Sequence, residues 1–160
     1  MSIKLLKDGA LKAEFLTCRK PCQHDCDDDN CLNEKKEIRL LERVIFQLPD
    51  SQILEIAPGF VFDGASIPQI CWTSIGHPLE HRFIYAALLH DALYVTQYLP
   101  RKTADEYFHR FLTEFAGVGS YTAWKMYTGV RLFGGGAWKG KTEEQITSAR
   151  KIITLKGATE

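Results

Sequence analysis

A histidine and an aspartate stand side by side in an apolar helical pattern, and they are the strongest candidates for chemistry in this chain. His90 and Asp91 follow Ala-Ala-Leu-Leu, Tyr94 comes four residues after the histidine, and Asp105 falls in the next helical pattern. Taking such groups out of water costs several kcal/mol unless they pair or bind a cation. The pattern therefore predicts either a buried hydrogen-bond network or a binding or catalytic site.

The spacing of these four residues indicates how they would cooperate. His90 and Tyr94 share one helical face, whereas Asp91 is turned by about 100° around the axis. Asp105 can return to His90 if the two helices form an antiparallel hairpin. A carboxylate on the imidazole Nδ1–H would fix the tautomer and leave Nε2 as a general base, with Asp91 able to hold a cation. The alternative is a lock in which imidazole and carboxylate only join two helices, with Tyr94 as a further partner.

A turn-rich passage over residues 58–68 precedes this helix and contributes two more polar candidates. Gly64 permits a positive φ, and Asp63 or Ser66 can cap the following helix. In a functional interpretation, Asp63 is a metal ligand or orienting residue and Ser66 contributes to substrate binding. Further along, Arg101 can pair with a nearby carboxylate or bind an anionic substrate.

A cysteine-rich segment lies between two predicted strands. Four cysteines fall within fourteen residues, at Cys18, Cys22, Cys26 and Cys31. They can bind one tetrahedral zinc ion, form two disulfides in an oxidising compartment, or remain thiols. The spacing is not the usual Cys-x2-Cys pair, and three adjacent aspartates add negative charge. In each case we expect the insert 18–31 to staple a long hairpin rather than to catalyse a reaction.

Length and composition fit one domain spanning residues 1–160. An apolar content of 45% and a charged content of 25% are ordinary for a globular chain of 160 residues. The formal net charge of zero argues against nucleic acid as a mainly electrostatic partner. No apolar run approaches the roughly 20 residues that span a bilayer, and the N-terminus lacks a signal-peptide core. We expect cytosolic synthesis, with packaging in a virion left open.

The order of the predicted elements indicates the fold class. Short apolar or alternating runs predict strands over 11–17, 38–48, 53–57 and 60–62. Helical spacing of apolar residues predicts helices over 79–97, 103–116 and 120–133, and a polar helix over about 142–155 within the C-terminal segment 141–160. Thr103 and Glu106 form a capping box, and Ser120 can cap the next helix. Strands first and helices after predict an α+β fold, with a small antiparallel sheet packed on three or four helices.

Several ordered motifs resemble those of a known family. They are P-G-F-x-x-D-G-A-S-I-P at 58–68, A-A-x-x-H-D-x-x-Y at 86–94, A-D-x-x-F at 104–108 and W-K-M-Y-T-G-V-R-L-F-G at 124–134. Over about residues 38–138 the chain resembles the bacterial and phage domain-of-unknown-function family numbered 1353. The resemblance implies a small phage or prophage protein of the host cytoplasm or the virion, acting with other phage or host proteins. It assigns no reaction, and the cysteine insert departs from its usual pattern.

The motif around His90 is also similar to the core of phospholipase A-2 enzymes, including compact viral capsid versions. That similarity implies His90 as the base, Asp91 as a ligand of calcium or another divalent cation, and Asp105 as the residue that orients the imidazole. The chain departs from those enzymes because no Y-x-G-x-G calcium loop precedes the helix. Two functions are therefore expected. One is a metal-assisted hydrolase of an ester or amide, and the other is a non-catalytic virion, tail or host-directed binding protein.

Overall fold

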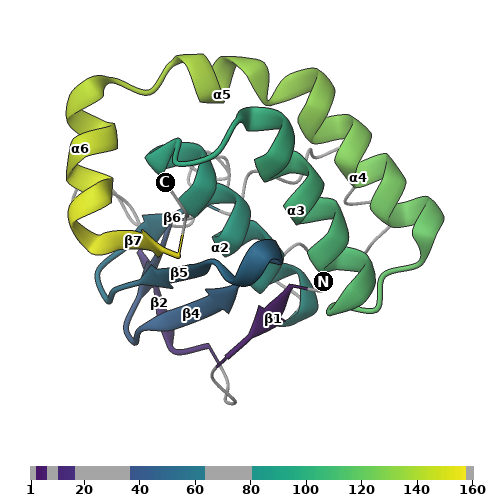
Figure 1. The fold of residues 1–160 in the computed structure, drawn as a ribbon, viewed down its shortest axis with the longest axis horizontal. Helices are drawn as coiled ribbons and strands as arrows, with labels where there is room; N and C mark the ends of the chain where they lie inside the picture. The colour runs from purple at the N-terminus through teal and green to yellow at the C-terminus, as the bar shows by residue number, and fades with distance from the viewer. Residues whose placement is uncertain (1–2, 7–10, 17–36, 64–80, 158–160) are drawn as a thin grey trace, which may run out of the picture.

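The computed structural model describes residues 3–6, 11–16, 37–63 and 81–157, which form two antiparallel sheets and a set of helices (Figure 1). This arrangement confirms the α+β class. Ser66 and the cysteine insert lie outside the described residues, so the predictions for them stay predictions. None of the described helices is long and apolar enough to cross a membrane.

The larger sheet has the order β1-β4-β5-β7. Its strands are β1 (Lys4–Leu5), β4 (Val44–Gln47), β5 (Ile53–Ile56) and β7 (Ile153–Lys156). The short 3-10 helix η2 (Pro49–Ser51) joins β4 to β5. Along β4 and β5 every second side chain is buried, as expected when one face of an antiparallel sheet packs on the core.

The smaller sheet has the order β2-β3-β6 and shows where one sequence prediction is wrong. Its strands are β2 (Ala13–Leu16), β3 (Glu37–Leu40) and β6 (Val61–Phe62). The run 38–48, predicted as one strand, is divided between β3 and β4, which belong to different sheets. The division falls at the charged pair Glu42 and Arg43, whose side chains make ion pairs with Lys12 and Glu55.

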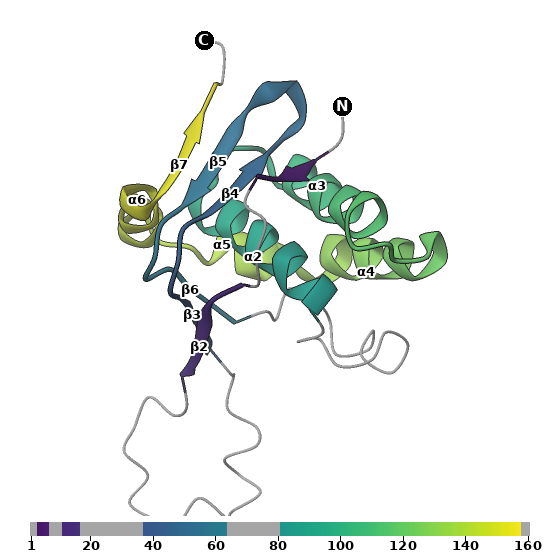
Figure 2. The same ribbon diagram turned by 90° about the horizontal axis from the view of Figure 1, so that it is seen from below.

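Helix α2 (His81–Thr96) is the central element, as Figure 2 shows. Most of its described side chains are buried, because β6 and the helices α3, α5 and α6 contact it on several sides. The other helices are α3 (Arg101–Glu114), α4 (Ser120–Phe133), α5 (Gly135–Lys139) and α6 (Glu143–Ile152). Helix α4 packs on α3, on the side of the molecule away from the larger sheet.

The helix ends differ from those that the sequence predicted. Helix α3 begins at Arg101, directly after Pro100, and Thr103 lies inside it without capping it. Pro100 is the N-cap residue, and because proline is excluded from a helix interior the helix begins directly after it. Gly119, rather than Ser120, is the residue before α4. A true capping box begins α6, where Thr142 and Gln145 exchange backbone and side-chain hydrogen bonds.

The predicted C-terminal helix over 142–155 is also too long. Helix α6 ends at Ile152, and the next four residues form β7 on the edge of β5. The sequence Ile-Thr-Leu favours a strand, and Ile153 is fully buried opposite Ile56. Burial against the sheet therefore outweighs the helical pattern at this point, and the C-terminal segment completes the larger sheet.

Candidate active site

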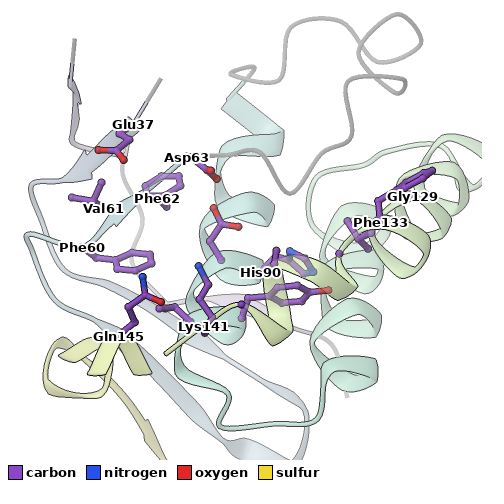
Figure 3. A pocket seen from close by; sticks show the side chains of 17 residues that line it. Glu37, Phe60, Val61, Phe62, Asp63, His90, Gly129, Phe133, Lys141 and Gln145 are labelled. Atoms are coloured by element: carbon purple, nitrogen blue, oxygen red, sulfur yellow. The ribbon is translucent and has the colours of Figure 1, made fainter. Parts of the chain in front are cut away.

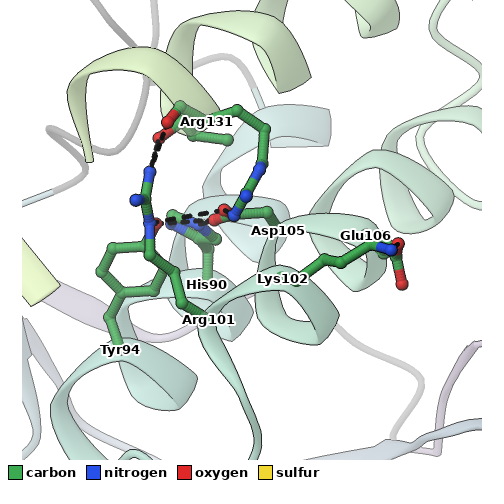
Figure 4. Close-up of polar contacts among 8 residues, drawn as sticks. His90, Tyr94, Arg101, Lys102, Asp105, Glu106 and Arg131 are labelled. Atoms are coloured by element: carbon green, nitrogen blue, oxygen red, sulfur yellow. Dashed lines mark hydrogen bonds and ion pairs between the residues drawn. The ribbon is translucent and has the colours of Figure 1, made fainter. Parts of the chain in front are cut away.

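His90, Tyr94 and Asp105 meet where α2 packs against α3 (Figure 4). Nε2 of His90 lies 2.8 Å from Oδ1 of Asp105, and the Tyr94 hydroxyl donates to the same oxygen at 2.6 Å. His90 and Tyr94 are one turn apart on α2, and the short connection 97–100 returns the chain so that α3 can present Asp105. The helical hairpin predicted from the spacing therefore brings these three side chains together.

The imidazole nitrogen that meets Asp105 is not the expected one. The sequence analysis placed the carboxylate on Nδ1, whereas the structure places it on Nε2. Nε2 is at the outer end of the ring and reaches across to α3, while Nδ1 stays close to α2. Nδ1 is buried and has no hydrogen-bond partner among the residues that the structure describes. The nitrogen able to accept a proton is therefore Nδ1 rather than Nε2.

Two arginines surround the carboxylate. Nη1 of Arg131 donates to Oδ2 of Asp105 at 2.7 Å. Arg101 donates from Nε to the Tyr94 hydroxyl at 3.2 Å and from Nη2 to the carbonyl oxygens of Val130 and Arg131. The structure thus places Arg101 between α2, α3 and α4, where it holds Tyr94 and the end of α4. Its expected role in substrate binding stays a prediction.

Burial determines the protonation state of His90. Only 1% of the residue is exposed, and this desolvation lowers the pKa of the imidazole, although the hydrogen bond to Asp105 acts in the opposite direction. The ring is therefore neutral at pH 7. A neutral ring beside an ionised carboxylate carries its proton on Nε2, and the lone pair is on Nδ1.

The partners of His90 keep Asp105 ionised. Burial alone would raise the pKa of its carboxyl, but hydrogen bonds from His90, Tyr94 and Arg131 outweigh it and lower the pKa. Burial, followed by the hydrogen bond to Asp105, raises the pKa of Tyr94 to about 12. The tyrosine hydroxyl consequently remains a donor, and Asp105 remains an acceptor for all three neighbours.

A cavity of about 550 Å³ opens beside His90 (Figure 3). Its walls come from β6, α2, the end of α4, α5 and the start of α6. Glu37 and Asp63 stand on one side of it, and Lys141 and Gln145 stand on the opposite side. The lining also includes Phe60, Asp91, Tyr94, Gly129 and Phe133. His90 therefore faces a space large enough for a small substrate.

The two carboxylates expected to bind a metal, Asp63 and Asp91, both line this cavity. Within the described ranges, however, no group of three or more His, Cys, Asp or Glu side chains is arranged to hold a metal ion. Calcium takes six to eight oxygen ligands, so these two side chains alone do not complete its shell. The divalent cation at Asp63 and Asp91 therefore stays a prediction.

Sequence reasoning missed the cavity wall formed by Lys141 and Gln145. The capping box of Thr142 and Gln145 is the sequence signal that could have located this wall, because it determines where α6 begins. Gly134, which follows the last residue of α4, packs against the same site. A Cβ atom at Gly134 would lie 2.7 Å from the Tyr94 hydroxyl, so glycine is needed there for close approach to the site.

The fold and the site define a small α+β protein with a buried histidine–aspartate pair beside a cavity. The sequence model of the family described as "Protein of unknown function (DUF1353)" matches residues 38–130, and the chain belongs to this family. The matched region contains His90, Tyr94 and Asp105 and ends eight residues before the end expected from the motifs. Searches of curated proteins and of solved structures give no match.

Proposed function

We propose that this protein is a hydrolase of an ester or amide in which Nδ1 of His90 is the general base. One observation carries the proposal: a buried imidazole lines a cavity, with Nε2 held by Asp105 and Nδ1 without a hydrogen-bond partner in the described part of the chain. A buried polar atom left unbonded costs about 1–3 kcal/mol. Such an atom is expected where a substrate or an attacking water completes the arrangement.

The proposed reaction uses Nδ1 to accept a proton from water while the water oxygen bonds to the carbonyl carbon of the substrate. The imidazolium that forms is stabilised by Asp105, which Tyr94 and Arg131 hold in place. Negative charge on the carbonyl oxygen can be stabilised by Lys141 across the cavity. The proton then passes from Nδ1 to the leaving oxygen or nitrogen as its bond to carbon breaks.

The test compares wild type with His90→Gln, because glutamine can still donate to Asp105 but provides no base. We expect the rate of hydrolysis of a p-nitrophenyl ester or the matching p-nitroanilide to fall by about a hundredfold or more. His109→Gln is the matched control, since this histidine lies on α3 with its ring against Tyr127. A His90→Gln protein that keeps the wild-type rate would contradict the proposal.

Asp105→Asn tests the supporting role of the carboxylate. This change should slow hydrolysis and also lower the free energy of unfolding by about 3 kcal/mol, because it removes the buried charge that accepts from three donors. Glu106→Gln, one residue later, removes only an exposed pair with Lys102 and should change stability by about 0.5 kcal/mol or less. Urea denaturation with the same ester assay measures both effects.

A second candidate is the non-catalytic phage component, in which the same residues lock α2 to α3. The near-complete burial of His90 and Asp105 favours it. In that case wild type would hydrolyse neither substrate, and His90→Gln would alter stability alone.

We also propose two metal sites on the basis of the sequence. Zinc at the cysteine insert and a divalent cation at Asp63 and Asp91 are both tested by elemental analysis of the purified protein together with a count of free thiols. Bound zinc with blocked thiols supports the first proposal, and calcium that is lost in Asp91→Asn supports the second.

A further inference from the structure

The outer face of α4 carries large apolar side chains in contact with solvent. Tyr121, Trp124 and Leu132 are 71%, 55% and 70% exposed. They recur on one side of the helix, opposite the side that buries Ala123, Met126 and Val130. Both views of the ribbon place α4 at the margin of the molecule (Figures 1 and 2). An exposed apolar helix face of this kind marks an interaction surface.

The aromatic residues on this face are ordered rather than scattered. The rings of Tyr121 and Trp124 stack with their centroids 6.3 Å apart, and Nζ of Lys125 lies 4.9 Å from the Tyr121 ring centroid. At the end of the helix Phe133 is 70% exposed and also lines the cavity. Phe133 thus faces the cavity side of the helix, and we call Tyr121, Trp124, Lys125 and Leu132 the α4 surface.

The segment of the chain that contains α4 carries only positively charged side chains. Residues 115–142 include no aspartate or glutamate, but they include four basic residues, Lys125, Arg131, Lys139 and Lys141. The whole chain, in contrast, balances 20 basic against 20 acidic residues. Arg131 is paired with Asp105, so the lysines supply the positive charge of this region.

These features favour an anionic lipid surface as the partner. Tryptophan and tyrosine prefer the boundary between water and hydrocarbon, and a lysine beside them, such as Lys125, is attracted to anionic headgroups. A second copy of the chain fits less well, because a symmetric contact would bring the same positive charges together. We propose that the α4 surface docks on an anionic bilayer, with α4 lying in the plane of the interface.

The test is sedimentation of the full chain with vesicles of pure phosphatidylglycerol or pure phosphatidylcholine. We expect binding to the first and little binding to the second. Lys125→Gln should weaken the partition about fivefold, and Trp124→Ser should weaken it at least as much. Lys151→Gln on α6 and Leu41→Ser before β4 are matched controls, because both residues are exposed and lie outside residues 115–142. Both controls should bind as wild type does.

Three results would overturn this proposal. The first is the absence of binding to phosphatidylglycerol vesicles by the folded wild-type chain. The second is binding that the α4 variants and the control variants reduce equally. The third is a dimer, detected by analytical ultracentrifugation and dissociated by Trp124→Ser, which would assign the α4 surface to self-association. Because the assay measures binding and not hydrolysis, the proposal stands or falls independently of the reaction at His90.

Discussion

At the scale of single residues, the site depends on one buried carboxylate with three donors. Asp105 accepts from His90, Tyr94 and Arg131, and each donor comes from a different turn or helix. This concentration of donors keeps Asp105 ionised and directs the histidine proton to Nε2. The position of the lone pair on Nδ1 is a consequence of that arrangement.

The shifted pKa values predict a pH dependence of stability. Burial lowers the pKa of folded His90 below its ordinary value of 6.5, so the unfolded chain binds the proton more readily. The free energy of unfolding should therefore fall as the pH drops below about 6.5, by up to about 1.4 kcal/mol per pH unit. Urea denaturation across this range should show the loss in wild type and a smaller loss in His90→Gln. Equal losses in the two proteins would contradict the account.

Asp105 affects the free energy of unfolding at a lower pH than His90 does. Hydrogen bonds outweigh the effect of burial and lower the pKa of its folded carboxyl below the ordinary 3.8. Its contribution to stability is therefore present above that value and is lost as the pH falls further. Acid unfolding should start at a higher pH in Arg131→Gln, which removes one of the donors.

Residue types and spacing located His90, Tyr94 and Asp105 in advance, because a helical hairpin leaves little freedom in where they meet. The same information could not select the imidazole nitrogen, since that depends on the distance between two packed helices. It also could not assign Arg101 to the α4 carbonyl oxygens, because this contact requires the position of a third helix.

At the scale of elements, the turn between α4 and α5 packs directly against the site. Gly134 lies against Tyr94, and Arg101 binds the last carbonyl oxygens of α4. These contacts join α2, α3 and α4 around Asp105. Gly134, the first of three consecutive glycines, is therefore needed because a side chain there would overlap Tyr94, and not only because glycine can end a helix.

Two alanine substitutions in the same turn should have opposite effects on the free energy of unfolding. Gly134→Ala should lower the free energy of unfolding by about 1–3 kcal/mol, because its Cβ would overlap the Tyr94 hydroxyl. Gly136→Ala has nothing within 4 Å of its Cβ and should raise stability by about 0.5–1 kcal/mol through helix propensity. Thermal melts compare the pair. Equal effects at the two positions would show that Gly134 is not a packing residue.

At the scale of the whole molecule, strand β7 from the C-terminal region completes the sheet that strands β1, β4 and β5 form. Strand β7 pairs with β5, and α6 contacts α2 directly. The sequence predicted the α+β class because strands precede helices. It could not predict β7 or the split between β3 and β4, since both depend on pairing between residues far apart along the chain.

Two neighbouring isoleucines test how much the pairing of β7 with β5 stabilises the fold. Ile153 is fully buried at the start of β7, whereas Ile152 is 36% exposed at the end of α6. Ile153→Ala should lower the free energy of unfolding by about 3 kcal/mol, and Ile152→Ala should lower it by about 1 kcal/mol or less. Urea denaturation of both variants measures the difference. Similar values for the two would mean that β7 adds little to the fold.

The most direct test of the proposed base is the tautomer of His90, read from nitrogen NMR of the ¹⁵N-histidine-labelled protein near pH 7. We predict that Nε2 carries the proton and that Nδ1 is unprotonated, with no change on mild acidification. The pattern should be lost in Asp105→Asn. A proton on Nδ1, or a doubly protonated ring at neutral pH, would contradict His90 as a base that acts through Nδ1.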